Sequence, residues 1–149
     1  MKIGFGADHA GYILKEKLIN HLNNEGIETF DYGTSSADRT DYPDYANKVG
    51  KAVQNGEVDY GVLICGTGIG MSIAANKVKG IRAALVYNEL TAKLAKEHNH
   101  ANIITLGART STAEEAKKIV DTFLKSTIEE RHQERIDKIT NLEKDNCNE

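Results

Sequence analysis

Residues 58–70 have the sequence VDYGVLICGTGIG, an almost unbroken apolar run that ends at Cys65 and is followed at once by a glycine-rich loop. A run of this kind is typical of a central strand in a parallel sheet, where helices cover both faces. The glycines predict a tight turn into a helix that begins near Met71 and continues to about Val78. The segment therefore predicts a strand–turn–helix unit at the centre of an α/β fold.

Four more apolar segments of strand length lie along the chain. They are Lys2–Phe5, Ile27–Asp31, Arg82–Tyr87 and Asn102–Leu106. Segments with the apolar spacing of helices separate them, over about 12–24, 43–55, 89–97 and 113–125, and a highly charged helix over about 129–144 follows. Strands that alternate with helices predict a Rossmann-like, three-layer α/β/α fold with a five-stranded parallel sheet and a C-terminal helix.

Length and composition restrict the class of protein. The chain has 149 residues, the size of one domain, and its net charge of −3 excludes a general nucleic-acid-binding surface. We expect neither a signal peptide nor a membrane span, and Cys65 and Cys147 form no paired motif. The chain is thus expected to be one cytoplasmic domain over residues 1–149, with a polar tail over 145–149 and Cys147 as an incidental surface thiol.

The end of the first predicted strand carries two ionisable residues. Residues 4–11, GFGADHAG, nearly match the dinucleotide-binding pattern GxGxxG, but His9 stands where the third glycine belongs. That glycine allows close packing of helix on strand, so we exclude a nicotinamide or flavin site. Asp8 is either a helix cap or a functional carboxylate, and His9 is either a surface loop residue or part of a site.

The loop after the central strand has the composition of an anion-binding turn. Its residues are Gly66, Thr67, Gly68, Ile69 and Gly70. Small residues let backbone N–H groups converge at the start of a helix, which favours an anion there, although the same composition suits a plain tight turn. Cys65 is either an inert core residue or, beside a helix N-terminus that stabilises a thiolate, a reactive group.

Basic residues and histidines cluster later in the chain. His98 and His100 in the segment EHNHA have the spacing of metal ligands, but no further ligand cluster supports a metal, so we expect none. His98 can instead carry a proton at a helix end. Arg109 follows the last strand, and Arg131 and Arg135 are four residues apart, which suits either a salt-bridged surface or a phosphate clamp.

Taken together, these motifs resemble one family, the sugar-phosphate isomerases that include the ribose-5-phosphate isomerases of type B. The matching segments follow one another in the family's order along almost the whole chain, as far as about Leu142. They are GADHAG at 6–11, RTDYPDYA at 39–46, ICGTGIGMSIAANK at 64–77, HN at 98–99 and RHQERI at 131–136. The first and third of these segments together are highly specific.

The resemblance implies a role for each matching residue. Cys65 corresponds to the base that moves a proton between the first two sugar carbons, because Met71 stands where some members carry a glutamate base. His98 corresponds to the acid/base that helps open the furanose ring. The remaining matches are substrate-binding residues, namely Asp8, His9, Asn99, Arg109, Arg131, Arg135 and the enediolate-stabilising loop Gly66, Thr67, Gly68, Ile69 and Gly70. The family uses no metal or cofactor, and its sites lie at a homodimer interface.

Three functions remain open at this stage. The leading expectation is interconversion of ribose 5-phosphate and ribulose 5-phosphate in the non-oxidative pentose phosphate pathway. The first alternative is isomerisation of a phosphorylated hexose, allose 6-phosphate or galactose 6-phosphate, because both reactions use the same motifs. The second is a non-catalytic module that binds an anion or nucleotide, which has no use for Asp8, Cys65 and His98 as a set.

Overall fold

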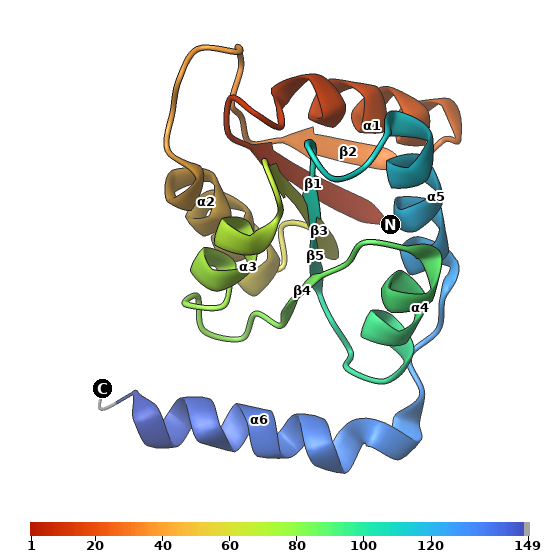
Figure 1. Ribbon diagram of the computed structural model, residues 1–149. Coiled ribbons are helices and arrows are strands. Elements are labelled where there is room, and N and C mark those ends of the chain that lie inside the picture. Colours follow the sequence, from red (N-terminus) through yellow and green to blue (C-terminus); the bar gives the residue numbers. More distant parts are fainter. Residues whose placement is uncertain (148–149) are drawn as a thin grey trace.

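A five-stranded, fully parallel sheet forms the centre of the computed structural model, which describes residues 1–147 (Figure 1). The strands are β1 (Lys2–Ala7), β2 (Glu28–Asp31), β3 (Tyr60–Cys65), β4 (Ala83–Leu85) and β5 (Ile103–Gly107). Their order across the sheet is β2-β1-β3-β5-β4, so the predicted central strand, β3, is indeed the middle one. The predicted fold class is therefore confirmed.

Helices cover both faces of the sheet. They are α1 (Tyr12–Asn24), α2 (Tyr42–Gln54), α3 (Ile69–Ala75), α4 (Glu89–Glu97), α5 (Ala113–Lys125), a 3₁₀ turn η1 (Glu130–His132) and α6 (Gln133–Asn146). Figure 1 shows α6 as a separate rod along one end of the molecule. Among residues 1–147, none of the helices combines the length and apolar character that crossing a bilayer requires.

The core has two parts, one on each face of the sheet. On one face, buried residues of α1, α4 and α5, such as Leu18, Ala95 and Phe123, pack on Ile3 and Ile104. The second face is covered by α2 and α3, whose buried residues include Val49, Met71 and Ala75. Successive side chains of a strand point to opposite faces of the sheet. Because helices cover both faces of β3, nearly every residue of this strand has to be apolar.

Several helix ends match their sequence signals. Asn88 caps α4, where its side chain accepts the N–H of Thr91 at 2.8 Å, and Thr112 caps α5 by accepting the N–H of Glu115 at 3.1 Å. Each pair forms a reciprocal capping box. Gly26, just after α1, has a φ of +79°, the left-handed conformation that glycine adopts at little cost.

Two predicted elements are shorter than expected. The fourth strand covers only Ala83–Leu85 instead of 82–87, and α3 ends at Ala75 instead of Val78. Asn76 lies at the end of α3 and the start of β4: its amide nitrogen donates to the carbonyls of Ser72 and Ala83, and its amide oxygen accepts the N–H of Ala83. The Asn76 side chain thus caps the helix and occupies the edge of β4. At the other end of β4, the N–H of Tyr87 donates to the Thr91 hydroxyl of the α4 cap.

The predicted last helix is two elements. The 3₁₀ turn η1 precedes α6, which continues to Asn146, so the expected polar tail is helical at its start; residues 148–149 lie outside the described residues. Of the three apolar residues spaced along α6, Ile136 is buried, whereas Ile139 and Leu142 are exposed. These two exposed side chains therefore leave an apolar surface open on α6.

The strand order creates a topological switch point between β1 and β3. The chain passes from β1 outward to β2 and then returns to β3 on the other side of β1, so the connections diverge between β1 and β3. In open α/β sheets, ligands bind beyond the carboxyl ends of the strands at such a switch point. Here Asp8 follows β1 and Cys65 ends β3.

Candidate active site

An open cleft of about 420 Å³ lies at this switch point. Its lining combines the ends of β1 and β3, the glycine-rich loop, the start of α2 and one arginine after β5. The residues that line it are Asp8, Tyr42, Cys65, Gly66, Thr67, Ile69, Gly70, Ile73 and Arg109. Seven of these nine were candidates from the sequence, so the fold brings the first half of the predicted site together in one chain.

Cys65 lies at the buried end of β3 with its sulfur facing the loop that follows. Only 5% of the residue is exposed, and the backbone N–H of Gly68 donates to Sγ at 3.2 Å. An N–H donor in this position stabilises negative charge on the sulfur, because hydrogen bonds to anions are stronger than those between neutral groups. The local geometry thus suits a cysteine that acts as a base or nucleophile.

The loop keeps this shape because glycine is required in it and because β5 braces it. Gly68 has a φ of +80°, and a Cβ there would lie 2.7 Å from Leu85 Cδ1 and 2.9 Å from the carbonyl carbon of Leu106. The Thr105 hydroxyl donates to the Gly68 carbonyl at 2.8 Å, and the Arg109 N–H donates to the Gly66 carbonyl at 2.9 Å. The loop is therefore held by contacts on both of its sides.

Asp8 stabilises a local turn and also lines the cleft. Its Oδ1 accepts the N–H of Ala10 at 3.0 Å and that of Gly11 at 3.2 Å, which stabilises the turn before α1. Asp8 is therefore not the cap of α1, whose N-cap is Gly11 without a side-chain bond, and its second carboxylate oxygen takes part in neither turn bond. The residue is 7% exposed, so its position relative to the cleft is well defined.

His9 points toward the loop before α2. Its Nδ1 lies 3.2 Å from both the nitrogen and the carbonyl oxygen of Thr40. The close approach of helix and strand is made by Gly11 instead, where a Cβ would lie 2.5 Å from the carbonyl oxygen of Ile64. The sequence had suggested that His9 obstructs the packing of α1 on the strand. It does not, and it follows directly after Asp8, which lines the cleft.

Two residues of the lining, Tyr42 and Ile73, were not singled out from the sequence. The ring of Tyr42 packs so closely that a Cβ at Gly70 would lie 2.6 Å from it. An aromatic residue directly before the only proline, at the start of a helix, was the available signal. Together with Ile73 on α3, it forms the apolar wall of the cleft.

The remaining candidates, His98, Asn99, Arg131 and Arg135, lie at the other end of the sheet. Within the chain, α4 ends just before β5 begins, while Cys65 pairs with Gly107, the last residue of β5. A strand of five residues spans roughly 16 Å, so His98 and Cys65 of one chain are separated by about the height of the sheet. The tertiary structure of a single chain does not bring the two halves together.

His98 has a defined set of neighbours at this second location. Its Nε2 lies 3.5 Å from Glu129 Oε1, and its ring packs on that of His132 at a centroid distance of 4.5 Å. Burial lowers the pKa of His132, and the positive charges of Arg131 and His98 lower it further. The hydrogen bond from Arg131 holds the pKa of Glu129 below its ordinary value, so Glu129 is ionised at neutral pH.

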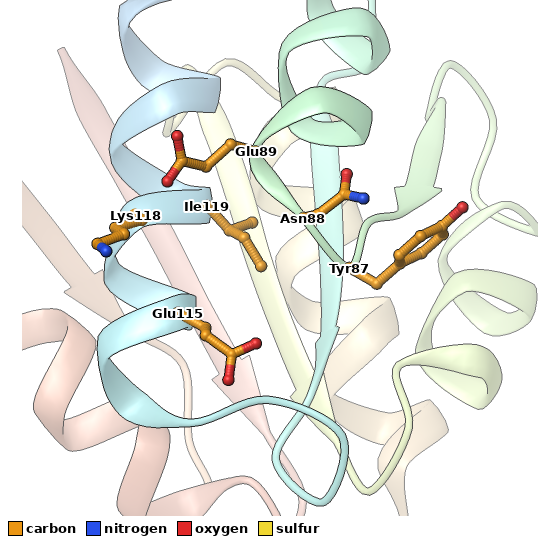
Figure 2. Close-up of a pocket in the computed structure, with 6 residues that line it drawn as sticks. All are labelled: Tyr87, Asn88, Glu89, Glu115, Lys118 and Ile119. Carbon is orange, nitrogen blue, oxygen red and sulfur yellow. The ribbon is translucent and has the colours of Figure 1, made fainter.

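A smaller hollow, of about 210 Å³, lies between the start of α4 and α5. Figure 2 shows the residues that line it. Two of its polar side chains are engaged at helix ends: Asn88 accepts from Thr91, and Glu115 accepts the hydroxyl of Thr112 at 2.9 Å. None of the candidate residues lines it. The Cys65 cleft therefore remains the candidate site.

Comparison with known proteins gives a consistent result. The family model described as Ribose/Galactose Isomerase matches residues 3–139. Ribose-5-phosphate isomerase B of Escherichia coli (strain K12) is 50% identical over 143 residues, which cover 95% of this chain and 96% of that protein.

Solved structures agree with these sequence matches. That of the Clostridium thermocellum ribose-5-phosphate isomerase B has a TM-score of 0.97 at 49% identity, and covers 99% of this chain and 100% of that one. A Mycoplasma genitalium relative, solved with bound ribulose 5-phosphate, has a TM-score of 0.91 at 46% identity, with 96% of each chain covered. The chain therefore belongs to the ribose/galactose isomerase family of enzymes.

Proposed function

We propose that this protein interconverts ribose 5-phosphate and ribulose 5-phosphate, with Cys65 as the base. The observation that carries the proposal is the N–H of Gly68, 3.2 Å from Cys65 Sγ, in a cleft that also contains Asp8 and Arg109. Membership of the family and the ribulose 5-phosphate bound to the Mycoplasma genitalium relative support this substrate.

The chemistry requires one base and one group that stabilises charge. In the open-chain aldehyde, the Cys65 thiolate removes the proton from C2, and the electrons move onto the carbonyl oxygen at C1 to give an enediolate. The C2 hydroxyl proton then moves to the oxygen at C1, and the thiol returns its proton to C1, which leaves a C1 hydroxyl, a ketone at C2 and the thiolate as it began. Transfer of a proton by a positioned side chain is typically worth ~10²–10⁴ in rate.

The enediolate oxygens need donors that are already in place. The loop Gly66–Gly70 supplies backbone N–H groups beside Cys65, held by Thr105 and Arg109. Donors that do not have to reorganise stabilise developing charge strongly, with about 10²–10³ in rate lost when one donor is removed. This proposed role explains why the loop has to be so tightly braced.

The second half of the site, in this proposal, comes from another copy of the chain. Because His98, Asn99, Arg131 and Arg135 lie at the opposite end of the sheet from Cys65, one chain alone does not assemble the full set. In a homodimer with two-fold symmetry, each copy presents these residues to the Cys65 cleft of the other. Arginines there bind the phosphate and fix the sugar in register.

Exposed apolar side chains support this homodimer. They occur on α3, β4, α4 and α6, all on the side of the sheet that ends at the edge strand β4. The residues are Ile69, Ile73, Leu85, Tyr87, Leu90, Ile139 and Leu142. Large apolar surfaces of this kind mark sites of protein association, and α6 lies as a rod along one end of the molecule (Figure 1).

The activity has a direct test. Cys65→Ala is expected to abolish the conversion of ribose 5-phosphate, since the Cys65 side chain supplies the base. The variant is expected to retain the wild-type melting temperature. Cys147→Ala is the matched control and is expected to be fully active, because Cys147 is exposed and remote. Wild-type turnover in Cys65→Ala would contradict the assignment of the base.

A second candidate function is isomerisation of a phosphorylated hexose. The family model supports it because its description names isomerases of both ribose and galactose. The same assay decides between the two when it is run with ribose 5-phosphate, allose 6-phosphate and galactose 6-phosphate. We expect the highest kcat/KM with the pentose. A higher value with either hexose would replace the proposed substrate, and no turnover of any of the three would contradict the isomerase proposal.

A further inference from the structure

Glu129 is held firmly at the end of α4, although it lies in the connection between α5 and η1. Its N–H donates to the carbonyl of Glu97 at 3.0 Å, and its own carbonyl accepts from Nε2 of His100 at 3.0 Å. His100 is 4% exposed and adopts a left-handed backbone, with a φ of +49°. A strained and buried residue is thus used to tie Glu129 beside His98.

The carboxylate of Glu129 divides its two oxygens between two candidate site residues. Oε2 accepts the Nε–H of Arg131 at 2.9 Å, while Oε1 lies 3.5 Å from Nε2 of His98. Arg131 is largely exposed and His98 is only half-buried, so burial alone does not fix either side chain. One carboxylate therefore limits the orientation of an imidazole and of a guanidinium.

His132 closes the other side of His98. It is 6% exposed, its ring lies at a centroid distance of 4.5 Å and an interplanar angle of 45° from that of His98, and its Nε2 has no hydrogen-bond partner within residues 1–147. Burial lowers the pKa of His132. His132 thus packs against the ring of His98, whereas the charged neighbour of His98 Nε2 is Glu129 at 3.5 Å.

We propose that Glu129 is a positioning residue that orients His98 and Arg131 together for the sugar phosphate. The inference rests on the proposed isomerase function, since it assigns Glu129 a task through those two residues. The same side chains, His98, Glu129 and His132, also have the proximity of a cation site. The guanidinium 2.9 Å from Glu129 already balances its charge, which favours the positioning role.

The two directions of the reaction distinguish a positioning role of Glu129, exerted through His98, from a general structural role in the protein. Ribose 5-phosphate is a closed furanose, so it needs the ring opening expected of His98. Ribulose 5-phosphate cannot close in that way, because its C5 hydroxyl is esterified. Exchange of its C1 proton with solvent deuterium therefore needs Cys65 and the loop but no ring step.

The experiment compares Glu129→Gln with wild type in both assays at saturating substrate. We expect kcat for ribose 5-phosphate to fall by about 10–100-fold, since a small loss of alignment is costly. The saturated rate of C1 exchange in ribulose 5-phosphate, followed by proton NMR in D₂O, is expected to stay within about twofold of wild type, while the KM values of both sugars rise with the loss of the Arg131 contact.

The matched control is Glu130→Gln, which makes the same charge change at the exposed neighbouring residue and is expected to leave both rates unchanged. Thermal unfolding verifies that each variant is folded. Equal losses in turnover and exchange would indicate a general structural role and overturn the proposal, and so would an unaffected Glu129→Gln. A wild-type protein without turnover or exchange would instead overturn the proposed isomerase function itself.

Discussion

At the scale of single residues, the same side chain often performs a structural and a chemical task. Asp8 stabilises a turn with one oxygen and lines the cleft, and Cys65 ends a core strand while its sulfur accepts an N–H. The sequence placed both residues at strand ends, but it could not separate the two tasks. Only the structure shows that the tasks use different atoms, so one does not exclude the other.

Lys96, which lies outside the site, is an ionisable residue whose side chain is buried, and burial disfavours its charged form. It is 3% exposed on α4, with Nζ 4.2 Å from the ring centroid of Tyr60 and 4.6 Å from that of Phe123. Burial lowers its pKa from 10.5 to about 8. The folded protein therefore binds fewer protons than the unfolded chain between about pH 8 and pH 10.5, so stability rises with pH in that window.

This predicts a pH-dependent difference between wild type and Lys96→Met. From pH 7 to pH 10.5 the wild type should gain about 2–3 kcal/mol in the free energy of unfolding relative to the variant, as a shift of this size implies. Urea unfolding at several pH values measures the difference. Lys93→Met, an exposed lysine of the same helix, should show no such trend. Parallel curves for wild type and Lys96→Met would contradict the prediction.

At the scale of elements, local signals predicted most helices well and failed where one element acts on another. The capping boxes at Asn88 and Thr112 involve only neighbouring residues, and both starts were correct. The end of α3 and the start of β4 were wrong because the Asn76 side chain bonds across to Ala83, a contact between two elements. The glycine-rich loop is similar, since Thr105 of β5 holds its shape from outside.

The bond from Thr105 to Gly68 gives a prediction at this scale. Thr105→Val keeps the shape of the side chain but removes the hydroxyl, so we expect a loss of about 1 kcal/mol in stability and a fall in kcat of about tenfold as the loop relaxes. Thr105→Ser retains the hydroxyl and should recover most of the activity. Stopped assays on both variants, with thermal unfolding, measure these effects. Full activity in Thr105→Val would show that the bond does not shape the loop.

At the scale of the whole molecule, the two groups of candidate residues lie at opposite ends of one sheet. The parallel topology causes this, because every helix returns the chain to the amino end before the next strand begins. Residues that follow strands therefore lie at the carboxyl end of the sheet, whereas His98, which follows a helix, lies at the amino end. A second copy is the arrangement that reconciles this separation with a common function.

Complementation between two inactive variants tests this arrangement. Cys65→Ala and His98→Asn should each be inactive, but an equal mixture, refolded together, should recover about a quarter of wild-type activity, because half of the dimers are mixed and each has one intact site. Mixing without refolding is the control and should recover little. No recovery after refolding would mean that Cys65 and His98 do not cooperate across an interface.

The sequence by itself determined the fold class, the order of the elements and the identity of the candidate residues. These depend on local periodicity, caps and motifs, which are written in consecutive residues. Tertiary structure decided which of those residues meet. It joined Asp8, Cys65 and Arg109 in one cleft, put His98 beside Glu129 and His132, and left the two groups apart. Such proximity is set by strand order and by packing between distant segments, and neither is encoded at any single position.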